Sequence, residues 1–160
     1  MPEVKAIPEG YHSVTPYLVV QDGAQAIEFY KRAFGAREVM RSEGPDRKVS
    51  HAEIKIGDSI VMLGGMTTGE LRAPQSLGAS TVSIFLYLDN VDATFKQALA
   101  AGAREAQPLA DMFWGDRYGR LTDPFGHSWS LAQHIENVAP AELEKRAREA
   151  MAKQQQRAHA

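Results

Sequence analysis

Apolar and polar residues follow the same order twice along the chain. In the first half, an apolar run over 14–20 leads through an acidic turn into a segment with apolar residues at helical spacing, which stops at Gly35. In the second half, an apolar run over 82–88 precedes a helical pattern over 92–101, which stops at Gly102. Each copy therefore predicts a strand and then a helix that begins near acidic residues and ends at a glycine.

Three strand-like segments follow each predicted helix. They cover 38–42, 49–56 and 59–63 in the first half, and 104–109, 117–122 and 128–134 in the second. The tetrapeptide Gly-Ala-Arg-Glu occurs at the same point of both copies, at 35–38 and at 102–105. A repeat of this kind indicates duplicated structural units. We therefore predict an α+β fold of two tandem βαβββ modules.

The repeat also sets the expected domain organisation. The first module should span 11–64 and the second 80–138, joined by a linker over 65–79 that contains glycine and proline. The remaining residues, 139–160, are rich in Ala, Glu, Lys, Arg and Gln. We expect this tail to form one exposed helix.

Composition narrows the possible functions. The chain has 160 residues and a net charge of −2, so there is no electrostatic reason to expect nucleic acid or an anionic membrane as a partner. It has no cysteine, which excludes disulfides, thiol nucleophiles and cysteine-based metal sites. No stretch approaches the roughly 20 apolar residues that span a bilayer. We expect a cytoplasmic protein.

Several stretches carry a family resemblance. The paired pattern, together with 26–30, 34–36 and 122–127, resembles the vicinal-oxygen-chelate superfamily of glyoxalases, bleomycin resistance proteins and dioxygenases. The variants at 51–59 and 123–129 are most similar to its PhnB-like branch. The resemblance covers roughly 11–138 and implies that the two modules curl their sheets into a cup.

The resemblance also implies where a metal would bind. In metal-dependent members, each module contributes one ligand from its first strand and one from its last. The matching positions here are Thr15 and Ser83 on the first strands and Met62 and Ser130 on the last. The repeat aligns Thr15 with Ser83 and Met62 with Ser130 independently of the resemblance. Neutral hydroxyls and a thioether are poor ligands for Zn²⁺, Ni²⁺ or Fe²⁺. We therefore expect no metal and no other cofactor.

A His–Glu pair offers an alternative centre. His51 and Glu53 are two positions apart and so share one face of their strand, opposite the apolar Ala52 and Ile54. They could act as a base or bind a divalent metal at a displaced site. They could equally form a polar pair on the wall or rim of the cup.

Aromatic residues are expected to line the cup. Tyr17 shares the face of Thr15, and Phe85 and Tyr87 share the face of Ser83. With Met62 they would form an aromatic and thioether surface suited to a flat apolar ligand. The other interpretation is that they close a small internal core.

The segment 111–120 combines large aromatic residues, arginines and glycines. Trp114 and Arg117 could stack on an aromatic or anionic ligand. Alternatively, Trp114 covers the end of the sheet or a dimer contact, and Arg117 pairs with Asp111 or Asp116. His127 and Trp129 have the opposite strand parity from Ser130, so we expect them to be structural.

Three functions are compatible with these observations. The first is a metal-free binding protein that holds a small aromatic or amphipathic molecule in the cup, as antibiotic-sequestering members of the superfamily do. The second is a metal-dependent lyase, isomerase or dioxygenase with a displaced site at His51 and Glu53. A third is an interaction module with a vestigial cup. Whether the protein is an enzyme stays open. We expect a homodimer, and the sequence does not decide whether modules pair within one chain or between two.

Overall fold

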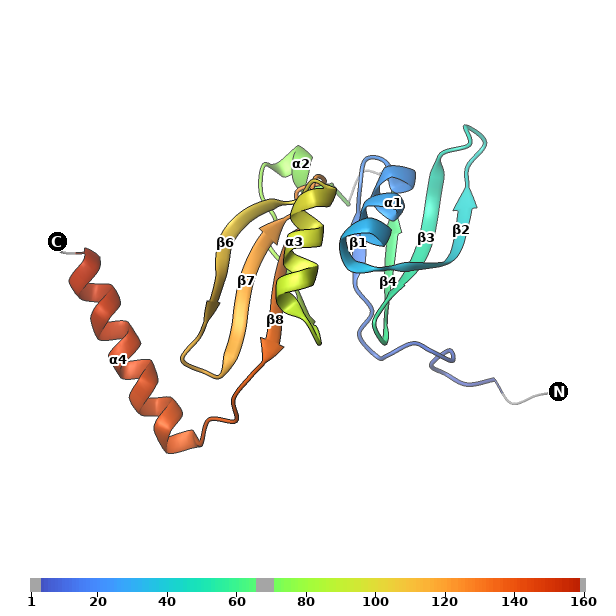
Figure 1. Ribbon diagram of the computed structural model, residues 1–160. Helices are drawn as coiled ribbons and strands as arrows, with labels where there is room; N and C mark the ends of the chain where they lie inside the picture. Colours follow the sequence, from blue (N-terminus) through green and yellow to red (C-terminus); the bar gives the residue numbers. More distant parts are fainter. Residues whose placement is uncertain (1–3, 66–70, 159–160) are drawn as a thin grey trace.

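A computed structural model describes residues 4–65 and 71–158. Part of the expected linker, 66–70, and the last two residues of the expected tail lie outside the described residues. The described chain contains two four-stranded sheets, each covered on one side by a helix (Figure 1).

The first module has the predicted βαβββ order. Its elements are β1 (Tyr17–Val19), α1 (Gly23–Phe34), β2 (Arg37–Glu43), β3 (Val49–Ile56) and β4 (Ser59–Gly64). The sheet order is β1-β4-β3-β2, with β1 parallel to β4 and the other pairs antiparallel.

The second module repeats this topology. Its elements are β5 (Ser83–Tyr87), α3 (Val91–Ala101), β6 (Arg104–Asp111), β7 (Asp116–Thr122) and β8 (Ser128–His134), in the sheet order β5-β8-β7-β6. The two modules also share the register of their parallel strands. Tyr17 pairs with Met62 in the first module, and Phe85 pairs with Ser130 at the equivalent positions of the second. The predicted α+β fold of two βαβββ modules is confirmed.

Local sequence explains where the two long helices begin and end. The Asp22 carboxylate accepts a hydrogen bond of 3.0 Å from the amide of Gln25, and the Asn90 side chain accepts one of 3.0 Å from Ala93. These contacts satisfy amides that have no partner inside a helix. Gly35 follows α1 with φ 64°, a left-handed conformation that glycine adopts without strain.

Three features differ from the sequence prediction. β1 begins only at Tyr17, because Pro16 has no amide hydrogen to donate to a sheet. Thr15 therefore precedes the first strand, and the prediction that it lies on that strand is wrong. A short helix, α2 (Pro74–Leu77), lies within the expected linker.

The apolar core lies between the helices and the sheets. Ala52, Ile54 and Ile56 of β3 face α1, and Leu121, Trp129 and Leu131 lie on the corresponding side of the second sheet. α1 also packs against α3, so the two modules meet through their helices (Figure 1). At this junction the Gln97 side chain donates a 2.7 Å hydrogen bond to the Arg32 carbonyl. We call the opposite, helix-free side of each sheet its open face.

The tail forms α4 (Pro140–Ala158), which extends away from the second module (Figure 1). None of its described residues is buried, as predicted for an exposed helix. Arg146 anchors its beginning through hydrogen bonds of 2.8 and 2.9 Å to the Glu136 carboxylate. Within the described chain, we find no helix that is both long enough and apolar enough to cross a membrane.

Candidate functional site

The open face of the second sheet carries a connected group of aromatic rings. Phe85 lies 5.1 Å from Tyr87 and 5.7 Å from Tyr118 between ring centroids, and Trp114 lies 5.7 Å from Tyr118. We call these four residues the aromatic wall. Phe85 and Tyr87 are 47% and 65% exposed, so the rest of the described chain leaves much of this face uncovered. Large aromatic side chains left in solvent at one place mark a surface suited to binding.

Hydroxyl groups form a hydrogen-bonded chain beside the aromatic wall. Ser128 donates to Ser83 at 3.1 Å, and the hydroxyls of Ser83 and Ser130 are 2.9 Å apart. Ser130 is in turn 3.1 Å from the hydroxyl of Tyr118. These hydroxyls satisfy one another and offer directional polar contacts. The exposed Arg120 pairs with Ser130 in the β7–β8 ladder, so a positive charge lies on the same face.

A buried carboxylate holds the aromatic wall in place. Asp116 is 3% exposed. It accepts hydrogen bonds from the Trp114 indole at 2.9 Å and from the Tyr87 hydroxyl at 3.0 Å. The pKa of Tyr87 is raised, first because its hydroxyl donates to this carboxylate. Two rings from different segments are therefore oriented by a single acidic side chain.

His134 completes the group around Asp116. Its Nδ1 lies 2.9 Å from Asp116 Oδ1, and its Nε2 lies 2.9 Å from Asn137 Oδ1. The Asn137 contact, followed by the Asp116 contact, raises the pKa of His134. Both oxygens favour the protonated ring, in which both nitrogens donate.

The open face of the first sheet carries the predicted His–Glu pair. His51 Nε2 lies 3.3 Å from Glu53 Oε1, and the His51 ring stacks on Tyr17 at 5.7 Å. Glu53 pairs with Met62 across the β3–β4 ladder. The sequence therefore placed His51, Glu53, Tyr17 and Met62 on the correct side of the sheet.

A residue outside the sheet also reaches this face. The Tyr11 hydroxyl donates a hydrogen bond to Glu53 Oε2. A hollow of about 400 Å³ lies between the segment that carries Tyr11 and the sheet, and Thr15, Glu53 and Met62 line it. Thr15 thus borders the open face from outside β1, with its hydroxyl bonded to the His12 carbonyl at 3.2 Å.

Arg117, which was expected to line the cup, does not lie on the open face. Arg117 lies on the helix side of the second sheet, where it forms two hydrogen bonds of 2.7 Å with Asp92 of α3 and one of 3.0 Å with Asp111. Side chains alternate along a strand, so Arg117 cannot share the face of Asp116 and Tyr118. The alternative pairing of Arg117 with Asp111 is confirmed.

His127 and Trp129 have structural positions, as their parity predicts. Trp129 is fully buried, and its indole donates a 2.9 Å hydrogen bond to Asp123. His127 Nε2 lies 2.9 Å from the Val19 carbonyl of the first module. The Trp129 ring also lies 4.7 Å from the Phe34 ring of α1, so both residues contact the first module.

The sequence prediction missed Tyr118, Asp116 and Tyr11. Tyr118 could have been found by counting three positions back from the apolar Leu121, which places it on the opposite face of β7. Asp116 has the same parity, but nothing in the sequence indicates that Trp114, Tyr87 and His134 share its carboxylate. Tyr11 lies outside any periodic element, so no strand pattern could place it.

The four positions that the family resemblance marks for metal do not fit a metal site. Ser83 and Ser130 bond to each other, and Thr15 lies outside β1 with its hydroxyl on a carbonyl. In the described parts of the chain, no group of three or more His, Asp or Glu side chains is arranged to hold a metal ion. At the displaced position, His51 and Glu53 supply only two ligands, and Tyr11 already contacts Glu53.

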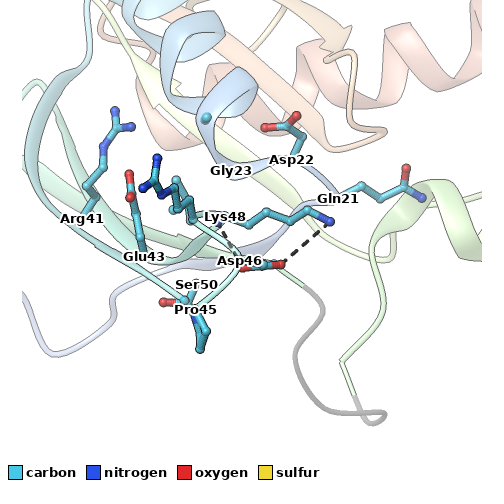
Figure 2. Close-up of a pocket in the computed structure, with 14 residues that line it drawn as sticks. Gln21, Asp22, Gly23, Arg41, Glu43, Pro45, Asp46, Lys48 and Ser50 are labelled. Carbon is cyan, nitrogen blue, oxygen red and sulfur yellow. Dashed lines mark hydrogen bonds and ion pairs between the residues drawn. The ribbon is translucent and has the colours of Figure 1, made fainter.

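A larger hollow, of about 790 Å³, lies at the end of the first sheet (Figure 2). The β2–β3 hairpin, the start of α1 and Gly65 border it. Basic and acidic side chains alternate around it, and Lys48 is 3.9 Å from Asp46. It contains none of the aromatic wall, and its mixed charges favour no ligand of one sign.

The chain is similar in sequence to a known superfamily and to a mycobacterial protein. The sequence profile of the Glyoxalase/Bleomycin resistance protein/Dioxygenase superfamily matches residues 10–131. An uncharacterised protein of Mycobacterium tuberculosis is 46% identical over 136 residues, which are 82% of this chain and 80% of the relative.

Solved structures with a similar fold include TioX from Micromonospora sp. ML1. It has a TM-score of 0.63 and 26% identity, over 78% of this chain and 99% of TioX. A bleomycin resistance determinant encoded on the transposon Tn5 has a TM-score of 0.58 and 25% identity, over 77% of this chain and 98% of the determinant.

Proposed function

Because the chain belongs to the glyoxalase/bleomycin resistance protein/dioxygenase superfamily, we propose that it is a metal-free binding protein for a small aromatic or amphipathic molecule. The ligand lies against the aromatic wall of the second sheet. Within the superfamily, the stretches at 51–59 and 123–129 support the PhnB-like branch.

The observation that carries this proposal is the exposed but ordered aromatic wall. Its rings contact one another at 5.1 to 5.7 Å, and Asp116 fixes two of them by hydrogen bonds. Rings that are already oriented lose little freedom when a flat molecule stacks on them. The hydroxyls of Ser83 and Ser130 add polar contacts at the edge of the same surface. Similarity to a bleomycin resistance determinant supports an organic ligand of this kind.

A second copy of the chain completes the cup in this proposal. The modules of one chain meet through α1 and α3, on the side away from their open faces. Each chain therefore presents two helix-free faces, and a homodimer that pairs unlike modules would enclose a ligand between them. Sedimentation equilibrium tests this point, because a monomer at all concentrations would contradict it.

Equilibrium dialysis tests the ligand directly. The protein is dialysed against acridine, a flat aromatic probe, and a panel of related compounds, while Trp114 emission is followed. Saturable binding of one probe molecule per chain supports the proposal. The variant Trp114→Phe provides the control, because buried Trp129 should not respond to ligand. Absence of saturable binding across the panel contradicts the proposal.

A metal-dependent lyase, isomerase or dioxygenase is the second candidate function. The single observation in its favour is the 3.3 Å approach of His51 to Glu53 on an open face. It requires a divalent metal in stoichiometric amount, so elemental analysis after purification without chelators separates the two candidates. Zinc, nickel, manganese or iron near one equivalent that His51→Ala removes would favour the enzyme.

A further inference from the structure

The segment before β1 places one of the chain's own phenol groups on the open face of the first sheet. Residues 6–8, Tyr11 and His12 border the 400 Å³ hollow on one side, and Glu53 and Met62 border it on the other. The Tyr11 hydroxyl donates to Glu53 within this arrangement. Tyr11 is thus bound to the sheet as a phenolic ligand would be.

We propose that Glu53 is a subsite for the hydroxyl of a phenolic ligand, and that Tyr11 occupies this subsite until such a ligand displaces it. The inference deepens the proposed function and rests on it, since it names the ligand class as phenols. In this inference, Glu53 on the first sheet selects ligands that carry a phenol hydroxyl, and the aromatic wall on the second sheet stacks on the ligand.

The surroundings of Glu53 explain why a donor is needed there. The Glu53 side chain is only 13% exposed, and His51 lies near one of its oxygens, Oε1. Tyr11 contacts the other oxygen, Oε2. A largely buried carboxylate oxygen that loses its donor pays the desolvation cost without compensation. A phenol that takes the place of Tyr11 keeps this oxygen hydrogen-bonded.

The surroundings of the ring explain why the donor is a phenol. The hollow is bordered by the Met62 thioether, Ile7 and Pro8, which are apolar, and by the hydroxyl of Thr15. Thioethers and prolines pack well against aromatic rings. A ring with one hydroxyl directed at Glu53 matches this mixture of apolar walls and one acceptor.

The attachment of the segment allows the exchange. Residues 4–15 form no helix or strand in the described structure. Apart from Tyr11, the polar side-chain contact that we find from these described residues to the sheet region is the 4.0 Å approach of exposed His12 to exposed Asp58. Exposed ion pairs contribute little to stability. The Tyr11 side chain therefore leaves Glu53 by giving up one hydrogen bond, while Ile7 and Pro8 of the segment still border the hollow.

Chemical rescue in the full-length chain tests the inference. The variant Tyr11→Ala removes the internal phenol, and p-cresol, which is the tyrosine side chain as a free molecule, is titrated and followed by the NMR signals of the His51 ring. We expect p-cresol to bind Tyr11→Ala at least tenfold more tightly than the wild type, in which Tyr11 competes. Toluene has the same ring and methyl group without the hydroxyl, and we expect it to bind at least tenfold more weakly.

Glu53→Leu in the Tyr11→Ala background removes the acceptor and should abolish the preference for p-cresol over toluene. Equal binding of the two compounds to Tyr11→Ala, or equal p-cresol affinity in Tyr11→Ala and the wild type, would overturn the inference. If Tyr11→Ala does not fold, Tyr11→Phe retains the ring and loses only the hydrogen bond. It should bind p-cresol several-fold more tightly than the wild type, and an unchanged affinity would overturn the inference in that case.

The outcome is separable from that of the proposed function. Acridine has no hydroxyl and reports on the aromatic wall, whereas p-cresol reports on Glu53. Acridine binding with no p-cresol rescue removes the inference and leaves the proposed function. Rescue by p-cresol without acridine binding would contradict the proposed stacking of a ligand on the aromatic wall of the second sheet.

Discussion

The hydroxyl of Tyr30 donates a 2.7 Å hydrogen bond to the carboxylate of Asp123, which lies 93 positions further along the chain. Tyr30 comes from α1 and Asp123 from the turn between β7 and β8, so this contact joins the two modules. The same carboxylate accepts from the Trp129 indole and from two backbone amides, all at 2.9 Å. Burial, together with this carboxylate, raises the pKa of Tyr30 well above its ordinary value.

Removal of this hydroxyl should destabilise the junction. We expect Tyr30→Phe to lower the free energy of unfolding by about 2 kcal/mol, because a buried carboxylate loses one of its donors. Tyr17→Phe is the matched control, since it removes a hydroxyl from a ring that is 44% exposed, and it should cost less than about 1 kcal/mol. Urea denaturation measures both. Equal losses in the two variants would contradict the role of Asp123 at the junction.

A glycine next to the aromatic wall should tolerate no side chain. Gly115 has φ 98°, and a Cβ atom there would lie 2.2 Å from the Glu136 carbonyl oxygen. Gly115→Ala should therefore lower the free energy of unfolding by about 3 kcal/mol and shift the emission of neighbouring Trp114.

Gly35→Ala is the matched control for this substitution. Gly35 also has a positive φ, of 64°, but a Cβ there would meet nothing within 4 Å. It should cost only the backbone strain, about 1 kcal/mol, and leave the emission unchanged. A smaller loss for Gly115→Ala than for Gly35→Ala would contradict this account.

How far the sequence could predict the structure depends on what each residue contacts. Core residues such as Ile54 and Trp129 follow from strand parity and the repeat, because both patterns reflect which face is buried. The same parity could have excluded Arg117 from the open face. The contacts of Asp116 and the position of Tyr11 could not be predicted, since strand parity does not say which side chains from different strands meet, and Tyr11 lies outside any periodic element. The shortening of β1 follows from Pro16, a signal that was present in the sequence.

Low pH should decrease the free energy of unfolding, partly through protonation of Glu38. Arg41 donates two hydrogen bonds to its carboxylate, at 2.6 and 2.8 Å, and this contact chiefly lowers the pKa of Glu38 to about 2. A lowered pKa means that the folded state gains stability above the ordinary value near 4.5 and loses it as pH falls towards 2.

Because the pair is at the surface, the contribution should be about 1 kcal/mol. Arg41→Met should flatten this part of the stability profile between pH 4.5 and 2. Arg37→Met on the same strand is the control. Superimposable profiles for Arg41→Met and the wild type would refute the assignment.

His134 should make the free energy of unfolding depend on pH in the opposite direction, with stability lost as pH rises. Its pKa is raised by Asn137 and Asp116, so its stabilising effect is complete below the ordinary value of 6.5 and is lost as pH rises through the folded value. We expect the wild type to lose stability through this group as pH rises above 6.5. Asn137→Ala should reduce that loss, as measured by urea denaturation across the range. A pH profile unaffected by Asn137→Ala would argue against the assignment.

The most direct measurement of the central claim is the dissociation constant of acridine for three proteins. They are the wild type, Phe85→Ala in the aromatic wall and Met151→Ala, which changes an exposed apolar residue on α4. Loss of one aromatic contact should weaken binding about tenfold in Phe85→Ala, while Met151→Ala keeps the wild-type value. Equal affinity in all three proteins, or no saturable binding to the wild type, would contradict a ligand site on the open face of the second sheet.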